Sequence, residues 1–204
     1  MSTLYKITGT NDRTFSDTQW GEGVTHTASG KGDLCTAGWI HACADPLVAV
    51  VMAPAYGYRG AIHLWEAEGE VGKSAPDGKV GTTSLTTVRQ IAVPEVTTPQ
   101  LVRLAILCAW QVCDNVEWRH WAERWLDGTD RTARAAAWAA RAPRAAAWAA
   151  AEEAAWAAAE EEEEATWARA EVAEAAVVAA KATPLDLPAL VRRAIAEEPT
   201  EDKR

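Results

Sequence analysis

The sequence predicts an α+β protein: a small β-rich N-terminal domain with one buried helix, followed by an Ala/Trp-rich α-helical bundle or long helical hairpin. Short segments separated by Gly, Pro and Asp fill the first half of the chain, as is typical of strands. Near residues 94–99 the composition changes from Thr, Val and Gly to Ala, Trp, Arg and Glu, and the apolar spacing becomes helical. We therefore predict a β-rich domain over residues 1–97, a helical domain over 98–197 and a disordered tail over 198–204.

Five segments of the first half are expected to be strands, over residues 4–8, 23–28, 38–43, 61–71 and 84–93. Alternation is clearest in AIHLWEAEGEV, residues 61–71, which places Ile62 and Leu64 on one face and His63 and Trp65 on the other. The Pro-Asp-Gly triplet in the loop 72–81 predicts a turn between two antiparallel strands.

One helix is expected among the strands, in the apolar run PLVAVVMA. Asp45 can cap its first turn, and Pro46 suits the first helical position because proline has no N–H to leave unpaired there. An almost wholly apolar helix of this kind should lie buried against the sheet.

The second half of the chain is expected to be helical. A helix should start at Thr98 before Pro99, and the segment EWRHWAERWLDG should form another that ends at Gly128. A long Ala-rich helix from residue 129 or 130 must break or kink at Pro143 and resume to about residue 182, before a short helix over 187–197.

Tryptophans mark the candidate interaction surface of the helical domain. On a helix, Trp148, Trp156 and Trp167 fall within a band of roughly 100°. An earlier segment carries a second aromatic edge, consisting of Trp118, Trp121 and Trp125. These six side chains could pack together within one chain, form a dimer seam or recognise another protein.

Charge and composition narrow the classes of partner. The formal net charge of −9 argues against direct nucleic-acid binding, which draws its affinity from Lys and Arg. No run of about eighteen apolar residues is present, and the first residues lack the pattern of a signal peptide, so we expect a cytoplasmic protein without membrane contact. The four cysteines are expected to be core thiols.

The segment CTAGWIHACADPL holds the most suggestive group of reactive side chains, Cys35, His41 and Cys43. A structural zinc site needs four ligands, and no second C-x-x-C or H-x₃₋₅-H pair completes this set, so we expect neither a metal nor a cofactor. Nucleophilic catalysis by a Cys–His pair stays open, because such partners meet in space rather than in sequence. Glu66, Glu68 and Glu70 share a strand face and are expected to be solvated.

The same segment carries a resemblance to a domain family of phage and bacterial proteins. The pattern His41, Cys43, Pro46, Leu47, preceded by Cys35 and followed by EAEGEV and TTVRQI, resembles that family's run C-x-x-G-F-H-x-C-x-x-P-L. Here Trp39 replaces Phe and Ile40 is inserted before the histidine. The second half resembles the Ala-rich segments that often follow such domains and that occur in putative bacterial immunity proteins. Neither resemblance implies a reaction.

LYKITGT and HACADPLVAV are also similar to the elements that frame the NAD cleft of ADP-ribosyltransferases, L-Y-[RH]-G-T and a strand followed by a P-x-x-A helix. The resemblance implies an NAD-dependent transferase. Lys6 replaces the Arg or His of that motif, however, and no E-x-E or Q-x-E stands near the last strand.

These observations favour a non-enzymatic accessory protein of a phage or mobile element, acting in the host cytoplasm by binding a host-defence protein or a small nucleotide. The candidate ligand-binding residues lie in the β-rich domain, where a nucleotide could also meet the tryptophans: Lys6, Arg13, His41, His63 and Trp65. The alternatives are a divergent ADP-ribosyltransferase-like enzyme and a structural protein that forms homo-oligomers through its Trp-bearing helices.

Overall fold

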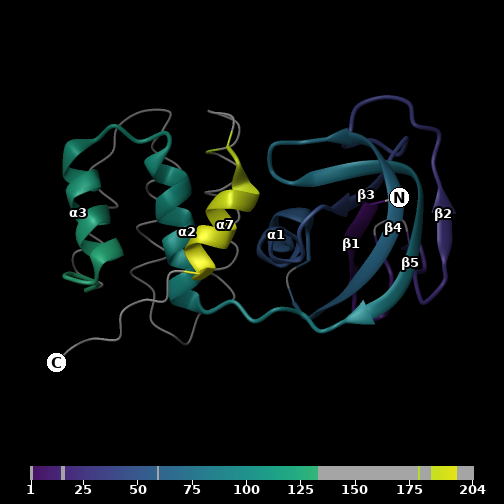
Figure 1. Cartoon of the computed structure of the whole chain (residues 1–204), viewed down its shortest axis with the longest axis horizontal. Coiled ribbons are helices and arrows are strands. Elements are labelled where there is room, and N and C mark those ends of the chain that lie inside the picture. Colours follow the sequence, from purple (N-terminus) through teal and green to yellow (C-terminus); the bar gives the residue numbers. More distant parts are fainter. Residues whose placement is uncertain (1, 15–16, 59, 133–178, 180–184, 197–204) are drawn as a thin grey trace. The chain divides into compact units, whose positions relative to one another are not determined.

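The computed structural model describes residues 2–14, 17–58, 60–132, 179 and 185–196. The chain divides into two compact units, Met1–Glu95 and Val96–Arg204, which we call the β unit and the helical unit. This division falls close to the predicted boundary at residues 97 and 98. An antiparallel sheet and several helices make up the described residues (Figure 1), so the predicted mixed α+β class is confirmed.

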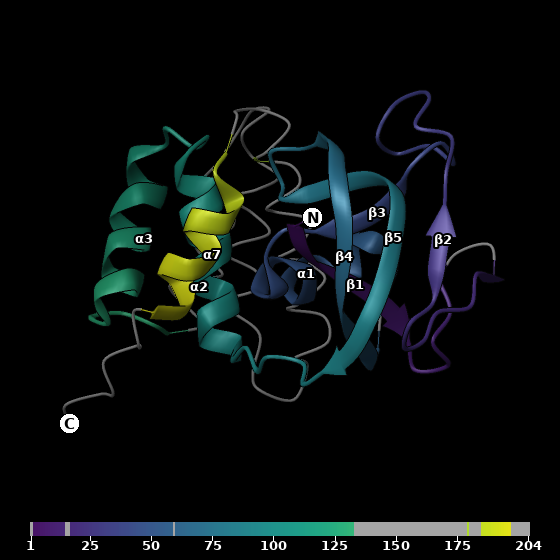
Figure 2. The same cartoon turned by 45° about the vertical axis from the view of Figure 1, so that its right-hand side comes forward.

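Five strands form the sheet of the β unit, and each overlaps one of the predicted segments: β1 (Ser2–Gly9), β2 (Thr25–Thr27), β3 (Ile40–Cys43), β4 (Ile62–Ser74) and β5 (Lys79–Ile91). The strand order is β2-β5-β3-β1-β4, and β5 pairs with β4 as well. The pairs β5–β3, β3–β1, β1–β4 and β4–β5 therefore close into a ring, along which the two long strands β4 and β5 curve together (Figure 2).

The ring has one weak junction, between β1 and β3. β1 and β4 pair along the whole of β1, from Ser2 opposite Gly69 to Gly9 opposite Ile62. β1 and β3, in contrast, share a single register pair, Tyr5 opposite Cys43. We call this short junction the β1–β3 seam, because the two strands are not paired beyond it.

The turn between β4 and β5 is tighter than predicted. It spans residues 75–78, with Ala75 N donating to Lys79 O (2.8 Å) and Gly78 at a φ of 81°. Gly72 and Gly81, the first and last residues of the predicted loop 72–81, lie within β4 and β5. Gly72 is needed there because the Trp39 indole lies against its backbone, and a Cβ would come within 2.5 Å of Trp39 Cζ3.

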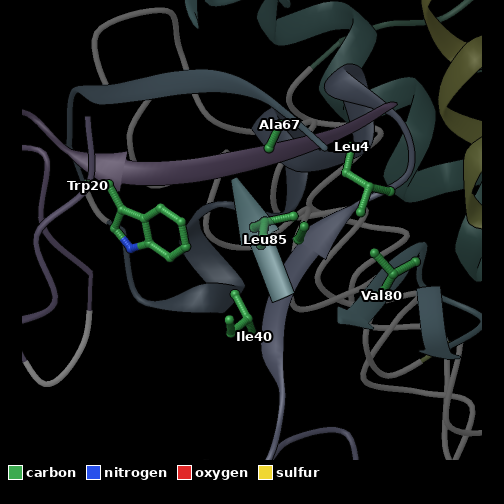
Figure 3. Packing of buried hydrophobic residues seen from close by; sticks show 7 residues of the cluster. Leu4, Trp20, Ile40, Ala67, Val80 and Leu85 are labelled. Carbon is green, nitrogen blue, oxygen red and sulfur yellow. The ribbon is translucent and has the colours of Figure 1, made fainter. Parts of the chain in front are cut away.

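Each face of the sheet carries a cluster of buried apolar side chains. One cluster takes a side chain from every strand of the ring and packs around Leu85 (Figure 3): Leu4, Trp20, Ile40, Ala42, Ala67, Val80 and Leu85. A second cluster covers the opposite face and includes Ile7, Cys43 and Leu64. This explains why the neighbours Leu64 and Trp65 are both buried, at 0% and 6% exposure, although they point to opposite faces.

Helix α1 (Pro46–Met52) supplies the cover of the second face, as predicted, with Ala49 buried beside Ile7 and Leu64. The Asp45 side chain caps it by accepting from Leu47 N (2.9 Å) and Val48 N (3.3 Å). A 3₁₀ turn, η2 (Pro54–Tyr56), follows and ends at Gly57, whose φ of 90° lies in the left-handed region.

The helical unit contains α2 (Thr98–Trp110), α3 (Val116–Asp127) and α7 (Leu187–Ala196) among its described residues. Thr97 and Gln100 form a capping box at the start of α2, and α3 ends at Gly128 as predicted. Gln100 Nε2 donates to Ile195 O (3.2 Å), which joins α2 to α7.

Most of the predicted Ala-rich helical segment, with its break at Pro143, lies outside the described residues, as does the predicted tail 198–204. No helix within the described ranges is long and apolar enough to span a bilayer.

Candidate functional site

A cavity of about 790 Å³ opens in the β unit, along both sides of the β1–β3 seam. Its lining comes from β1, β3, the start of β5, the segments 14–28 and 35–39, and the residues just after α1. The described residues that line it include four basic side chains, Lys6, His26, His41 and Lys79. None of these described lining residues is an aspartate or a glutamate, although the whole chain has a net charge of −9.

Lys6 is the buried cation of this cavity. Its side chain lies on the same face of β1 as Leu4, only 9% of the residue is exposed, and its Nζ lies 4.9 Å from the centroid of the Trp20 ring. The Nζ donates to His41 O (2.8 Å), a carbonyl of β3 next to the end of the seam. The lysine thus satisfies a strand carbonyl that β1 does not reach.

Burial lowers the pKa of Lys6 from 10.5 to about 8, against a smaller opposing effect of Cys43. The ammonium is therefore still mostly protonated at pH 7. Among the described residues, no carboxylate forms an ion pair with Lys6 or Lys79. A buried cation without a counter-ion is costly, and such a site favours an anion.

Lys79 supplies the second charge. It begins β5 directly opposite Cys43 of β3. Its Nζ lies 4.5 Å from the centroid of the Tyr56 ring and donates to Cys35 Sγ (3.6 Å). Cys35 is exposed at the cavity, unlike the other three cysteines of the chain, which are buried.

The charges of both lysines act on the His41 ring. Burial is the largest cause that lowers its pKa, and the charges of Lys6 and Lys79 lower it as well, while a hydrogen bond with Leu34 O opposes these effects. The ring is therefore neutral at pH 7. Since Nε2 faces the Leu34 carbonyl and must donate to it, Nδ1 is left as an acceptor.

The side chains of Cys43 and Tyr56 interact with each other, and both are buried. Burial, reinforced by the charge of Asp77, raises the pKa of Cys43 to about 12, and burial likewise raises that of Tyr56. The Tyr56 hydroxyl is buried and has no oxygen or nitrogen partner among the described residues. Both groups are protonated at neutral pH, whereas nucleophilic catalysis requires a thiolate.

Aromatic rings form much of the remaining wall, namely Tyr5, Trp20, Trp39, Tyr56 and Tyr58. The Trp20 ring packs edge-to-face with His26 at a centroid distance of 4.6 Å, and its Nε1 donates to Thr14 Oγ1 (3.2 Å). Trp39 Nε1 donates to Gly32 O (3.0 Å). These hydrogen bonds hold the indoles in place, so the cavity has fixed aromatic surfaces as well as charge.

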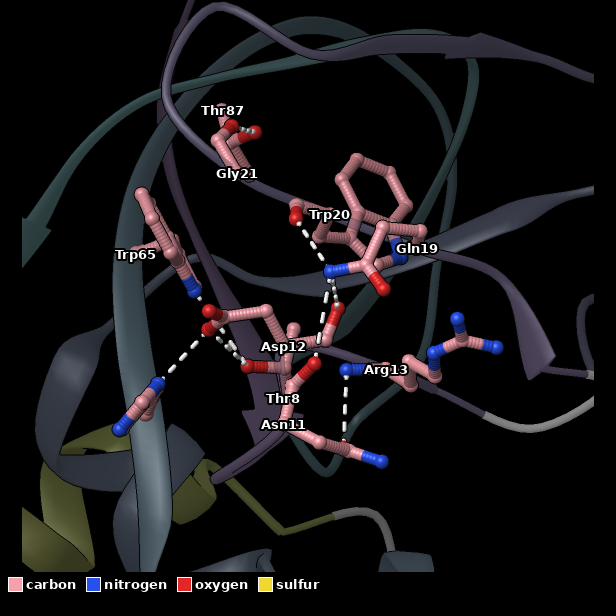
Figure 4. Close-up of polar contacts among 10 residues, drawn as sticks. Thr8, Asn11, Asp12, Arg13, Gln19, Trp20, Gly21, Trp65 and Thr87 are labelled. Carbon is pink, nitrogen blue, oxygen red and sulfur yellow. Dashed lines mark hydrogen bonds and ion pairs between the residues drawn. The ribbon is translucent and has the colours of Figure 1, made fainter.

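Two of the five predicted ligand-binding residues, Lys6 and His41, line the cavity, and the other three do not. Arg13 pairs with Asp17. His63 and Trp65 belong to a separate polar cluster around Asp12 (Figure 4): His63 Nδ1 lies 2.7 Å from Asp12 Oδ1.

In the same cluster Trp65 Nε1 donates to Thr8 Oγ1 (3.3 Å), and the Thr8 hydroxyl donates to Asp12 (3.5 Å). The carbonyl of Asp12 accepts from the backbone N of Trp20 (2.7 Å). This cluster therefore supports the turn that leads to Trp20 without lining the cavity.

Sequence reasoning missed Lys79, Tyr56 and Tyr58. The motif PAYGY directly after the buried helix is a signal for the two tyrosines, because a glycine between aromatics after a helix end predicts a sharp turn that keeps them near the helix terminus. No local signal exists for Lys79. It joins the site through the β3–β5 register, which the local sequence does not define.

The candidate interaction tryptophans of α3 are core residues in the structure. Trp118, Trp121 and Trp125 are 0%, 0% and 4% exposed, and Trp118 packs against Trp110 and Trp121 at centroid distances of 6.2 and 5.8 Å. Their burial places them inside the helical unit rather than on an exposed interaction surface. Trp148, Trp156 and Trp167 lie outside the described residues.

Cys35, His41 and Cys43 do not converge on a common point in the structure. Among the described residues, no three His, Cys, Asp or Glu side chains come together in a way that could hold a metal ion. Cys35 instead contacts Lys79, and Cys43 packs in the core beneath α1.

Comparison with known proteins found no match to this chain among family models, curated proteins or solved structures.

Proposed function

We propose that this protein binds a small anionic ligand with an aromatic ring, of the nucleotide class, in the cavity of the β unit. The observation that carries the proposal is a cavity whose described lining residues include two lysines and two histidines but no carboxylate, within a chain of net charge −9. Its volume of about 790 Å³ lies within the range of about 300–1,000 Å³ that is usual for small-molecule sites.

The charge of the site supports an anion. Lys6 has three N–H donors, of which the His41 carbonyl takes one. The remaining donors of a buried ammonium need acceptors, and a phosphate group supplies several.

The walls support a ring. Trp20, Trp39 and Tyr56 are held at the cavity by packing and hydrogen bonds. Stacking on an aromatic side chain is worth about 1–3 kcal/mol per base and requires no particular base. A nucleotide brings both the anion and the ring in one molecule.

The protonated Cys43 thiol favours holding the ligand over attacking it, because a nucleophilic cysteine must be a thiolate. We therefore propose sequestration of a nucleotide as the biological role, in keeping with an accessory protein of a phage or mobile element that acts in the host cytoplasm. Two other roles stay predictions, because they depend on residues outside the described ranges. They are the blocking of a host-defence protein and self-association through a bundle or hairpin of the Ala/Trp-rich segment.

Thermal unfolding tests the proposal. The purified protein is heated with AMP, cyclic AMP, NAD or inorganic phosphate, and with the guanine, cytosine and uracil mononucleotides. A ligand at about one hundred times its Kd should stabilise the fold by about 2.7 kcal/mol.

Lys6→Met keeps the length of the side chain but removes its charge, and should weaken nucleotide binding about tenfold or more, since a charged hydrogen bond is lost. The matched control is Lys31→Met, an exposed lysine of the β unit that does not line the cavity. Equal affinity in the two variants, or no stabilisation by any nucleotide, would overturn the proposal. Release of nicotinamide from NAD would instead support the transferase alternative.

A further inference from the structure

We infer that the cavity distinguishes ligands by their phosphate, binding a terminal phosphate monoester between Lys6 and Lys79 in preference to a cyclic phosphodiester. The inference rests on the proposed function and names the chemical class of ligand that this site takes.

Lys6 and Lys79 approach the same part of β3 from opposite faces of the sheet, and both line the cavity. Lys6 lies on the face that packs against Trp20, and its Nζ reaches the His41 carbonyl at the β1–β3 seam. Lys79 lies opposite Cys43, on the face covered by α1 and Tyr56. Because His41 and Cys43 are two residues apart on β3, both lysines flank the same short length of strand.

Each of the two ammonium groups already has an aromatic ring as a neighbour. Trp20 lies 4.9 Å from Lys6 Nζ, and Tyr56 lies 4.5 Å from Lys79 Nζ. These rings occupy one side of each cation, and the remaining N–H donors are available to the cavity. The charges of both lysines lower the pKa of His41 and the pKa of Cys43, which agrees with this arrangement.

The charge of the phosphate distinguishes the two classes of ligand. A phosphate monoester carries up to two negative charges, so each of the two ammonium groups can neutralise one of them. A cyclic diester carries one charge and leaves the second ammonium without a counter-charge. The Asp77 carboxylate accepts from Lys79 N (3.1 Å) and acts on Cys43 and Tyr56, but it does not line the cavity, and no ion pair joins it to either lysine among the described residues.

Isothermal titration calorimetry tests the inference with three compounds of each base: the nucleoside, its 5′-monophosphate and its 3′,5′-cyclic monophosphate. For the base that binds best, the monophosphate should bind about tenfold more tightly than the cyclic form, because its second negative charge is neutralised by the second ammonium. Lys79→Met should remove this preference, whereas Lys31→Met should retain it.

Cys35 supplies a second measurement that does not depend on heats of binding. It is the exposed cysteine and lies 3.6 Å from Lys79 Nζ, so a phosphate at Lys79 should slow its alkylation by iodoacetamide severalfold. The nucleoside should protect it less than the monophosphate does. Cys35→Ser serves as the control for labelling at the buried thiols.

The outcomes separate the two proposals. Binding of the cyclic form as tightly as the monophosphate, or an unchanged preference in Lys79→Met, overturns this inference and leaves nucleotide binding in place. Failure of every nucleotide and of inorganic phosphate to bind overturns the proposed function itself.

Discussion

Replacing Lys6 with methionine should make the unliganded β unit more stable at neutral pH. The folded-state pKa of Lys6 is about 8, against 10.5 for an ordinary lysine, because burial disfavours the charged form. One pKa unit corresponds to about 1.4 kcal/mol, so the charge costs the folded state about 3 kcal/mol at pH 7. Methionine removes that cost, although it also leaves the His41 carbonyl without its donor.

The pH dependence isolates the electrostatic part. Between pH 8 and pH 10.5 the unfolded chain binds more protons at this lysine than the folded one does, so the stability contribution of Lys6 rises with pH over that window. The stability difference between Lys6→Met and wild type should therefore shrink by about 2 kcal/mol from pH 7 to pH 10. The loss of the hydrogen bond to the His41 carbonyl does not depend on pH.

The assay is equilibrium unfolding in urea, with a short pulse of iodoacetamide and mass spectrometry of the labelled peptides. Labelling of the buried Cys43 reports the β unit, and labelling of the buried Cys108 reports the helical unit as an internal control. A stability difference at Cys43 that is the same at pH 7 and pH 10 would refute the reasoning, because the lysine would then not be a desolvated cation.

Two further substitutions test the packing that shapes the site. Gly72→Ala places a Cβ 2.5 Å from the Trp39 ring and should destabilise the β unit by about 1–3 kcal/mol in thermal unfolding; Gly60→Ala, where a Cβ meets nothing within 4 Å, should leave it unchanged, and equal effects would contradict the close packing of Trp39. Asp45→Ala removes the cap of α1 and should lower the unfolding free energy that Cys43 labelling reports by about 1 kcal/mol. Asn115→Ala removes the cap of α3 and should lower the value that Cys108 labelling reports by a similar amount. If either substitution changed the labelling of the other unit instead, loss of the cap would not be the cause.

Local physics made part of the fold predictable from the sequence. Asp45 followed by Pro46 marks the start of α1, and Gly128 marks the end of α3, because caps depend on residues adjacent in the chain. Gly, Pro and Asp between short segments located all five strands for the same reason, and alternation supported β4 in particular. Alternation separates the two faces of a strand. It could not show that Leu64 and Trp65 are both buried, since this follows from the closure of the sheet and the cover that α1 provides.

The site was harder to predict because its members come from separate parts of the chain. Lys6 and His41 could be proposed from their residue types, but the hydrogen bond that joins them depends on the early end of the β1–β3 pairing. Lys79 reaches the cavity through the register of β5. His63 is of a suitable type but meets Asp12 instead, in a cluster that lies outside the cavity.

The closed ring of strands also affects how the protein folds during synthesis. β1 leaves the ribosome before β4, its main partner, and at about 5–20 residues per second the interval lasts seconds. During that interval the apolar side chains of β1 have no sheet to join. Lys6 and Thr8 interrupt its apolar face, as polar residues do in natural strands that must avoid aggregation. The lysine that is costly in the finished fold thus makes the nascent strand less apolar before the ring closes.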